Sequence, residues 1–445
     1  MAALTVSDRY LRLVIVASAV GTIIEWYDFY IFGSLARILS THFFPRVDPV
    51  AAFLETVALF TIGFLIRPLG AFIFGRVGDI IGRKYTFLVT LTGMGVSTAL
   101  IGVIPGYEQI GTLAAVLLFI LRLVQGLTLG GEYGGAITYV AEHVPDERRG
   151  YWTGWLQTSP TVGLLVSLVV VIGTRLLMGD EAFDAWGWRI PFLLSLVLIL
   201  ISIYIRLKLQ ETPVFEELKR RRATAQNPWR EAFLSSNIKY VLIAAVIVIG
   251  QGVVWYSSQF WALFFLQTVQ KLDVLTSSTI VGAALLLAFP FFIILGALSD
   301  RIGRKPIILG GMALAALTYY PLYSALGYVA QPGNVNYVAA VLLVWVMVLY
   351  VAMVYGPIAA FLAEFFPSRI RYTSVSVPYH IGNGWGGGLV PFITSAAWAG
   401  TQNLGATLMY PILVPAIAFL LGLFIMPQTH RLSLWQEPAA EAAST

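Results

Sequence analysis

Long runs of apolar residues, separated by short polar stretches, follow one another along the whole chain of 445 residues. A helix needs about 20 apolar residues to cross the hydrocarbon core of a bilayer. Lipid offers no partners for backbone N–H and C=O groups, so these runs are expected to be helices. The pattern predicts twelve membrane-spanning helices, at residues 11–36, 55–75, 85–105, 111–140, 151–177, 188–207, 238–267, 276–298, 306–328, 337–362, 372–398 and 405–427.

The composition agrees with a membrane protein and leaves no room for a soluble domain of ordinary size. Hydrophobic residues make up 58% of the chain and charged residues 11%, and the mean hydropathy is +0.80. Soluble proteins carry about 25% charged residues. The absence of cysteine excludes disulfides, thiolate metal sites and cysteine nucleophiles. No small-residue cleavage site follows the first apolar run, which predicts a retained span and not a signal peptide.

The basic residues predict the orientation. If the N-terminus is cytoplasmic, 21 of the 28 Lys and Arg residues lie on the cytoplasmic side and 5 on the other. Such an excess on the cytoplasmic side is the usual distribution in membrane proteins. It explains the net charge of +5 without nucleic acid as a partner. An even number of spans then places both termini in the cytoplasm, with the chain in the plasma membrane of a bacterium or archaeon.

A long polar stretch divides the twelve spans into two groups of six. We therefore expect an N-terminal half at 1–207, a cytoplasmic linker at 208–237, a C-terminal half at 238–427 and a short cytoplasmic tail at 428–445. The linker contains the basic run 219–222, which is typical of an amphipathic segment lying on anionic lipid.

The loop between the second and third spans of each half is repeated. The segment Gly-Arg-Val-Gly-Asp-Ile-Ile-Gly-Arg-Lys at 75–84 returns 221 residues later as Gly-Ala-Leu-Ser-Asp-Arg-Ile-Gly-Arg-Lys at 296–305. A second pair, Ala-Glu-His-Val-Pro at 141–145 and Ala-Glu-Phe-Phe-Pro at 363–367, has an offset of 222. Both copies face the same side of the membrane, which indicates a parallel duplication of a six-helix unit.

The twin loop resembles the signature loop of the major facilitator superfamily. Arg122-x-x-Gln125-Gly126 resembles a second motif of that superfamily. The resemblance implies an all-α membrane fold, with twelve transmembrane helices in two parallel-repeat six-helix halves that transport a solute by alternating access. Three more stretches, Glu-Trp-Tyr-Asp-Phe at 25–29, Arg-Pro-Leu-Gly at 67–70 and Gly-Gly-Glu-Tyr-Gly-Gly at 130–135, resemble the metabolite:proton symporter branch, which includes carriers of α-ketoglutarate, citrate, shikimate and proline/betaine.

The repeated loop is a candidate gate. An Asp at a helix end can accept backbone N–H bonds at the N-terminus of a neighbouring helix and pair with Arg. The resemblance implies that such a latch holds the two halves together on the inner side. The alternative is a tight turn that carries positive-inside charges. The candidate gating residues are Gly75, Asp79, Gly82, Arg83, Gly296, Asp300, Gly303 and Arg304.

Five ionisable residues lie within spans of the N-terminal half, where each costs about 2.5–3.5 kcal/mol even on the lower insertion scales. Glu25 and Asp28 share a helix face, and two partly desolvated carboxylates do not both ionise easily. We hypothesise that Asp28, with Glu25 and Glu132, carries the proton, and that protonation of Asp28 frees Arg122 for an anionic substrate. The alternative, for Arg67 as well, is a permanent ion-pair cluster that fixes helix packing.

The C-terminal half offers polar but uncharged groups within its spans. Amide, hydroxyl and imidazole groups can orient a polar solute through hydrogen bonds. Ordinary packing is the alternative for each aromatic residue. The glycines in 126–135 and 382–388 are expected to allow close helix contact. The candidate substrate-binding residues are Arg67, Arg122, Gln251, Tyr256, Gln259, Tyr355, His380 and Asn383.

No cofactor is predicted. The match to G-x-G-x-x-G at 382–387 follows no strand, so a dinucleotide site is not expected there. Neither a phosphate-binding loop nor metal-ligand spacing is found, and no catalytic constellation indicates an enzyme.

The sequence thus predicts proton-coupled symport of a small organic solute, most readily a carboxylate, by a monomer embedded in lipid. Two intramembrane arginines beside carboxylates favour the anionic solute. Alternatives are a proton symporter of a zwitterionic osmolyte such as betaine or proline, a proton-coupled exporter, and a membrane protein with no transport function.

Overall fold

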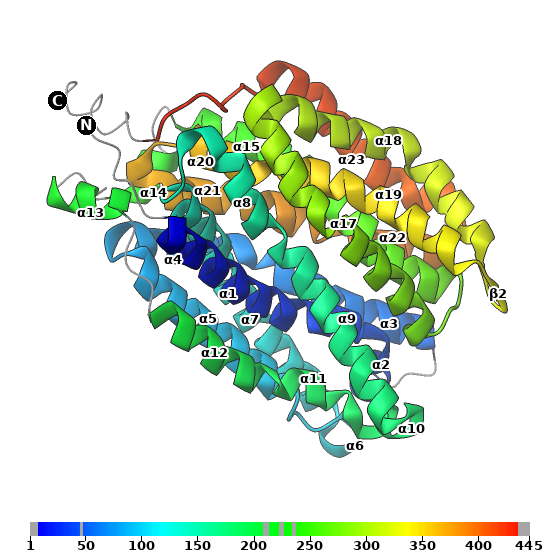
Figure 1. Cartoon of the computed structure of the whole chain (residues 1–445). Coiled ribbons are helices and arrows are strands. Elements are labelled where there is room, and N and C mark those ends of the chain that lie inside the picture. Colours follow the sequence, from blue (N-terminus) through cyan, green and yellow to red (C-terminus); the bar gives the residue numbers. More distant parts are fainter. Residues whose placement is uncertain (1–7, 45–47, 208–212, 222–226, 234–236, 435–445) are drawn as a thin grey trace.

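The computed structural model describes residues 8–44, 48–207, 213–221, 227–233 and 237–434 (Figure 1). The first half contains α1 (Asp8–Ser34), α2 (Ala36–Phe43), α3 (Pro49–Leu65), α4 (Arg67–Ile80), α5 (Arg83–Ile101), α6 (Tyr107–Ile110), α7 (Thr112–Ala141), η1 (Asp146–Arg148), α8 (Arg149–Gln157), α9 (Ser159–Met178), α10 (Asp180–Ala182), η2 (Phe183–Gly187), α11 (Arg189–Leu193) and α12 (Ser195–Leu207).

Two short linker helices follow, α13 (Pro213–Arg220) and α14 (Pro228–Phe233). The second half contains α15 (Ile238–Tyr256), η3 (Ser257–Trp261), α16 (Ala262–Phe264), η4 (Phe265–Val269), α17 (Val274–Ile302), α18 (Arg304–Val329), β1 (Ala330–Gln331), β2 (Asn334–Val335), α19 (Tyr337–Tyr355), α20 (Ile358–Phe365), η5 (Ser368–Ile370), α21 (Arg371–His380), η6 (Ile381–Gly387), α22 (Val390–Thr401) and α23 (Leu404–Ile425). The β1–β2 pair is a small antiparallel hairpin.

The helical fold agrees with the predicted twelve-span arrangement. Among the described residues, nine helical segments are long and apolar enough to cross a membrane by themselves. The other three predicted spans are also helical, but each is too short, too bent or too polar to meet that criterion by itself. Within α5 the apolar part is Leu88–Ile101, the span from α10 to α12 bends by 49°, and α21 is rich in buried hydroxyl groups. Such a polar helix is tolerated because it faces other helices and not lipid.

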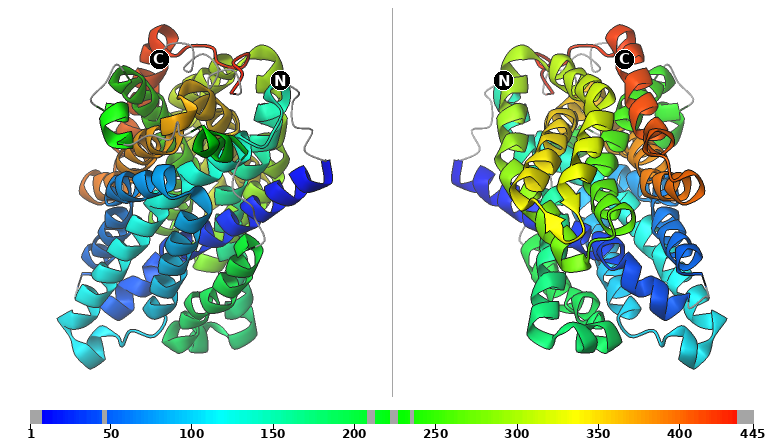
Figure 2. Two further views of the ribbon diagram at one scale, coloured as in Figure 1. Left: turned by 90° about the vertical axis from the view of Figure 1, so that its left-hand side faces the viewer. Right: turned by 90° about the vertical axis from the view of Figure 1, so that its right-hand side faces the viewer.

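The two halves lie side by side, the first in blue to green and the second in green to red (Figures 1 and 2). Across the interface α17 packs on α8 and α9, α21 packs on α4 and α7, and α3 packs on α22. The linker helices α13 and α14 lie at one end of the bundle, whereas α6 and α10 lie at the other (Figure 1). We name the first the inner end, since it contains the loops predicted to be cytoplasmic, and the second the outer end.

The contact between α4 and α7 depends on two glycines. A Cβ atom at Gly70 would overlap the carbonyl oxygen of Leu127, and one at Gly130 would overlap that of Arg67. Small residues let helix backbones approach in this way. The predicted close contact through the glycines of 126–135 is confirmed. This approach brings Arg67 of α4 and Arg122 of α7 into one layer of the bundle.

Replacing Gly130 with Val is expected to lower the melting temperature sharply or to prevent recovery of folded protein. The new side chain meets backbone atoms of α4, which do not move aside, and overpacking of this kind typically costs about 1–3 kcal/mol or more. Gly173→Val in α9 is the matched control, because a Cβ there has nothing within 4 Å. Melting in detergent measures both variants; equal melting temperatures would contradict the packing role of Gly130.

The described part of the linker packs on the protein. Val214 and Leu218 of α13 are 2% and 3% exposed, and α13 contacts η5. The predicted amphipathic helix is present, but these apolar side chains are covered by protein and not left free for lipid. Arg222 and residues 208–212, 223–226 and 234–236 of the predicted linker lie outside the described residues.

Candidate functional site

The charged residues predicted within spans are all buried between helices. Asp28, Arg67 and Arg122 are 0% exposed, and Glu25 and Glu132 are 1% exposed. Helix α1 supplies the first carboxylates, α4 begins at Arg67, and α7 supplies the rest. Burial away from lipid is what the cost of these charges demands. Glu25 and Glu132 both have interaction partners, so neither is isolated.

Arg67 links the two halves. Its Nε–H donates to His380 Nδ1 at 3.1 Å, from α4 to α21. Its guanidinium lies 5.0 Å from the ring centre of Trp26 and 5.4 Å from that of Phe64. The Arg67 Nη1 and Nη2 atoms and His380 Nε2 are buried without a hydrogen-bond partner. Since Nδ1 accepts, the neutral imidazole holds its hydrogen on Nε2. The site therefore presents three buried nitrogen donors that have no hydrogen-bond partner among the described residues.

Arg122 is held differently. Its Nη1 donates to Gln125 Oε1 at 2.7 Å, and its Nη2 donates to the carbonyl of Phe60 at 3.1 Å. The rings of Phe29 and Phe32 lie 4.3 and 4.5 Å from the guanidinium. Neither Arg122 nor Arg67 forms an ion pair with any carboxylate that the structure describes. Of the two arginines, Arg67 keeps more donors available.

Asp28 is close to Arg122 but not paired with it. Ser195 of α12 donates to Asp28 Oδ1 at 2.5 Å, and Oδ2 is buried without a hydrogen bond. Gln125 joins the two residues instead: it accepts from Arg122, while its amide donates to Thr98 at 2.7 Å and to the Asp28 carbonyl at 3.4 Å. The structure therefore contains no direct Asp28–Arg122 contact, and Gln125 lies between Arg122 and the Asp28 main chain.

The candidate residues of the second half fall into separate groups. His380 contacts Arg67, and the hydroxyl of Tyr256 lies 3.5 Å from that of Tyr30 in α1. Gln251 and Asn383 bond mainly to each other, with an Asn383 Nδ2 to Gln251 Oε1 distance of 2.8 Å. This amide pair ties α15 to η6. Gln259 is buried, and neither of its amide atoms has a hydrogen-bond partner.

Tyr355, a predicted substrate-binding residue, belongs to a group inward of Arg67 whose other members sequence reasoning missed. The rings of Tyr133 and Tyr379, from opposite halves, stack at 3.6 Å, and the hydroxyls of Tyr355 and Tyr379 lie 2.7 Å apart. Tyr133 also donates to Gln157 at 2.6 Å, which in turn donates to the Tyr355 carbonyl. Apart from Tyr355 itself, the position of Tyr133 beside Glu132, inside a recognised motif, marks this group in the sequence. Ser195, one of two serines in an apolar span, carries no comparable signal.

The two halves contact each other on both sides of this charged layer. Toward the outer end, Phe60 meets Phe260 at 5.0 Å between ring centres and Phe53 meets Phe264 at 5.5 Å. Toward the inner end lie the Tyr133–Tyr379 stack and the repeated loops. Arg67 thus lies between contacts that join the two halves toward both ends of the bundle.

The repeated loops form two equivalent contacts between the halves. Asp79 Oδ2 accepts from the Thr373 N–H at 3.0 Å and from its hydroxyl at 2.6 Å. Asp300 accepts from the N–H groups of Gly150 and Tyr151 at 2.7 and 2.8 Å. Each Asp thus bonds the first turn of a helix in the other half, the contact expected for a latch. We name these the Asp79 latch and the Asp300 latch.

Neighbouring residues of the repeat shape both latches. Gly82 and Gly303 have φ of 126° and 97°, a backbone conformation that favours glycine. A Cβ at Gly75 would lie 3.2 Å from Thr373 Cα, and one at Gly296 would overlap the Gly150 carbonyl. The Arg83 side chain lies outside the described residues.

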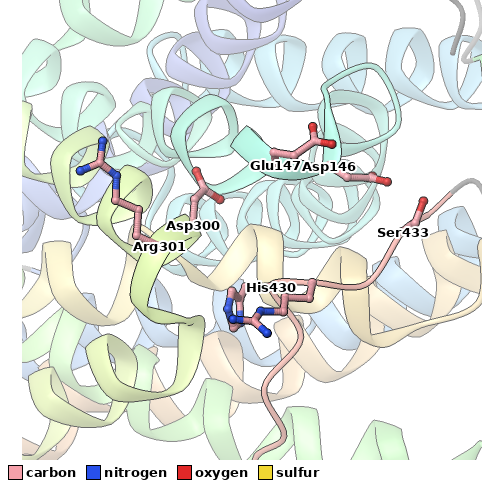
Figure 3. A pocket seen from close by; sticks show the side chains of 7 residues that line it. Asp146, Glu147, Asp300, Arg301, His430 and Ser433 are labelled. Atoms are coloured by element: carbon pink, nitrogen blue, oxygen red, sulfur yellow. The ribbon is translucent and has the colours of Figure 1, made fainter.

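Arg304 connects the Asp300 latch to a buried carboxylate. It donates to Asp300 at 2.7 Å and to Glu364 at 2.8 Å, and Glu364 also accepts from Arg149 of the first half at 2.9 Å. In the other half of the repeat, the pair equivalent to Arg149 and Glu364 is Arg371 and Glu142, with 3.0 Å between Arg371 Nη1 and Glu142 Oε1. Beside the Asp300 latch is a pocket of about 540 Å³ (Figure 3), lined by Asp146, Glu147, Asp300, Arg301, His430, Arg431 and Ser433.

Charge reversal at Asp79 is expected to slow turnover about tenfold and to change substrate affinity by less than twofold. The carboxylate loses two charge-assisted hydrogen bonds, each worth about 1.5–3 kcal/mol, in the inner-closed state only. Asp79→Lys is compared with Asp48→Lys, which removes a helix cap at the outer end of α3. Exchange rates and equilibrium binding separate the two effects; normal turnover in Asp79→Lys would rule out a gating role.

Comparison with known proteins identifies the family to which the repeated loops and the buried charged residues belong. Residues 18–391 match the family model described as Major Facilitator Superfamily. The chain belongs to the major facilitator superfamily. It is a multi-pass membrane transporter of metabolites and not an enzyme.

Relatives within the superfamily cover nearly the full chain. It is 34% identical to the inner membrane metabolite transport protein YhjE of Escherichia coli and 33% identical to the α-ketoglutarate permease of the same species, each over 95% of both chains. It is 33% identical to the glycine betaine/proline/ectoine/pipecolic acid transporter OusA of Dickeya dadantii, over 99% of this chain and 88% of that protein. The proton:xylose symporter XylE has the same fold, with a TM-score of 0.79, 17% identity and coverage of 98% and 100%.

Proposed function

We propose that this transporter is a proton symporter of a small organic solute that carries a carboxylate group, working by alternating access. The observation that carries the proposal is the pair Arg67 and His380, which leaves three buried nitrogen atoms without an acceptor. These nitrogens belong to opposite halves of the molecule, so one bound carboxylate would contact both halves at once.

The substrate class follows from the donors. A buried cation without a partner is costly, and an unsatisfied buried donor costs about 1–3 kcal/mol or more. A carboxylate offers two acceptor oxygens and a negative charge, and it binds an Arg guanidinium through two parallel hydrogen bonds. The two terminal nitrogens of Arg67 are free for that geometry, and His380 Nε2–H adds a third donor. The relative named α-ketoglutarate permease supports a carboxylate as cargo.

Asp28 is proposed to carry the proton. Its Oδ2 is buried and makes no hydrogen bond, so it can take up a proton without breaking a contact. Ser195 holds the other oxygen in place. Gln125 is proposed to connect this region to Arg122, because its amide nitrogen contacts the main-chain carbonyl of Asp28 and its amide oxygen accepts from the arginine. Glu25 and Glu132 are proposed as secondary proton sites in the same layer.

Alternating access is proposed to break two sets of contacts in turn. Opening outward separates the Phe60–Phe260 and Phe53–Phe264 pairs, while both latches stay closed. Opening inward breaks the Tyr133–Tyr379 stack, the Asp79 latch and the Asp300 latch. The inner end is proposed to face the cytoplasm of a bacterium or archaeon, with both termini on that side. The charge distribution and the relative named an inner membrane protein support this orientation and location.

A zwitterionic solute is the second candidate, and a ring cluster beside Arg67 favours it. Tyr30 stacks between Trp26 and Trp255, with ring centres 4.9 and 5.4 Å apart. Aromatic faces bind quaternary ammonium groups, so a betaine would place its carboxylate on Arg67 and its cation on these rings. The relative named for glycine betaine, proline, ectoine and pipecolic acid supports this alternative.

Uptake into proteoliposomes tests the proposal. Radiolabelled α-ketoglutarate, other small carboxylates and glycine betaine are offered with an inward proton gradient and with the gradient collapsed. Gradient-dependent accumulation of a carboxylate supports the first candidate, and accumulation of betaine alone supports the second. Accumulation that ignores the proton gradient would overturn proton symport, and accumulation only with an outward gradient would favour export.

A further inference from the structure

The linker helix α14 lies against the Asp79 latch and contacts both halves there. Trp229 is its anchor in the first half. The indole Nε1–H donates to the Phe72 carbonyl at 2.9 Å, and the indole stacks on the Phe72 ring with centres 4.1 Å apart and planes 12° from parallel. The Arg76 guanidinium lies 4.4 Å from the indole centre. Phe72 and Arg76 precede Asp79 on α4, so Trp229 holds the very helix that supplies the latch.

The same short helix is anchored in the second half. Glu231 pairs with Arg369 of η5 at 2.9 Å between Oε2 and Nη2. Ala232 is fully buried and, with Phe233, packs against Ile370. Helix η5 leads directly into α21, whose first turn contains the other latch residue, Thr373. Both partners of the Asp79 latch are thus tied to one segment of six residues.

The chain after the last span occupies the equivalent place at the Asp300 latch. Thr429 donates to Glu364 of the second half at 2.6 Å, and Arg149 of the first half donates to the Leu432 carbonyl at 3.3 Å. Each latch therefore has beside it the segment that follows the sixth span of its own half. A duplicated architecture that places such a segment beside both latches indicates a common task for the two segments.

We propose that α14 is a clasp that holds the inner gate closed and sets how often it opens during transport. The halves separate at this end only if α14 leaves either α4 or η5. Trp229 and Glu231 are the residues that decide how strongly it holds. The proposal deepens the proposed function, since it concerns the regulation of the same transport path, but its test requires neither a substrate nor a proton gradient.

The experiment measures the opening of the inner end directly. The chain contains no cysteine, so Ile81→Cys and Ile302→Cys introduce two unique spin-label sites without further changes. These positions are equivalent in the repeat, belong to opposite halves, and are 60% and 51% exposed. Pulsed dipolar spectroscopy of the labelled, reconstituted full chain then gives the distance distribution between the halves and the fraction of inner-open molecules.

Trp229→Ala is expected to raise the ratio of inner-open to inner-closed molecules about tenfold, because a stack, a cation–π contact and a hydrogen bond are lost in the closed state. Glu231→Arg is expected to raise it in the same direction, and adding Arg369→Glu is expected to restore the original distribution. The control is Arg230→Ala, an exposed position on the same helix.

The clasp would be overturned if Trp229→Ala and Glu231→Arg showed the same distance distribution as Arg230→Ala. It would also be overturned if Arg369→Glu, in a folded double variant with Glu231→Arg, did not restore the original distribution. The rescue keeps the proposal testable even if Trp229→Ala does not fold. Failure of the proposed function would appear instead as missing proton-driven uptake, with the distance distributions unaffected.

Discussion

Replacing Asp28 with Asn is expected to abolish proton-driven accumulation while leaving exchange of solute across the membrane. Asparagine keeps the size of the side chain and can still accept a hydrogen bond from Ser195, but it has no proton to release. A carrier that stays permanently in the protonated form binds solute and moves it down its gradient. Counterflow and gradient-driven uptake in the same proteoliposomes separate these two activities.

Asp184→Asn is a suitable control, because that residue lies at the outer end and pairs with Arg175 at the surface. Ser195→Ala provides a second test of the role of Asp28. It removes the hydrogen bond from Ser195 to the Asp28 carboxylate and should displace the pH profile of uptake without abolishing it. If Asp28→Asn still concentrates solute against its gradient, Asp28 is not the proton carrier and Glu25 or Glu132 becomes the next residue to replace.

Replacing Arg67 with Gln is expected to weaken carboxylate binding by about a hundredfold or more. Two charge-assisted hydrogen bonds of about 1.5–3 kcal/mol each would be lost, and every 1.4 kcal/mol is a factor of ten in affinity. Arg122→Gln is the matched comparison. Its guanidinium is already engaged by Gln125 and the Phe60 carbonyl, so its loss should lower the melting temperature more than the affinity.

Titration calorimetry on purified protein in detergent gives both affinities, and melting in the same detergent gives both stabilities. The reverse result, with Arg122→Gln losing affinity and Arg67→Gln retaining it, would move the anion site to Arg122. His380→Gln tests the cross-half part of the site. It keeps an acceptor for Arg67 but changes the position of the second donor, so a smaller loss than in Arg67→Gln is expected.

Much of this site is visible in the sequence because charges within apolar spans are costly and therefore stand out. Asp28, Arg67 and Arg122 are identified in this way, and all prove to be buried in the bundle. The proposed pairing of Asp28 with Arg122 does not appear in the structure. Spacing along a helix gives depth in the membrane, but the partner of a side chain depends on how each helix is rotated about its axis. Gln125 therefore intervenes where a direct contact was expected.

The sequence by itself determined the spans, the duplication and the two latch loops of this protein. Lipid requires long apolar helices, and a duplicated gene leaves its repeat at a nearly constant offset. Both features can therefore be detected in the amino-acid sequence alone. Only the tertiary structure decided which groups meet. Ser195 reaches Asp28 across 167 residues, His380 reaches Arg67 across 313, and Trp229 docks on Phe72 across 157. Such contacts arise when helices from distant parts of the chain pack together, and no local periodicity records them.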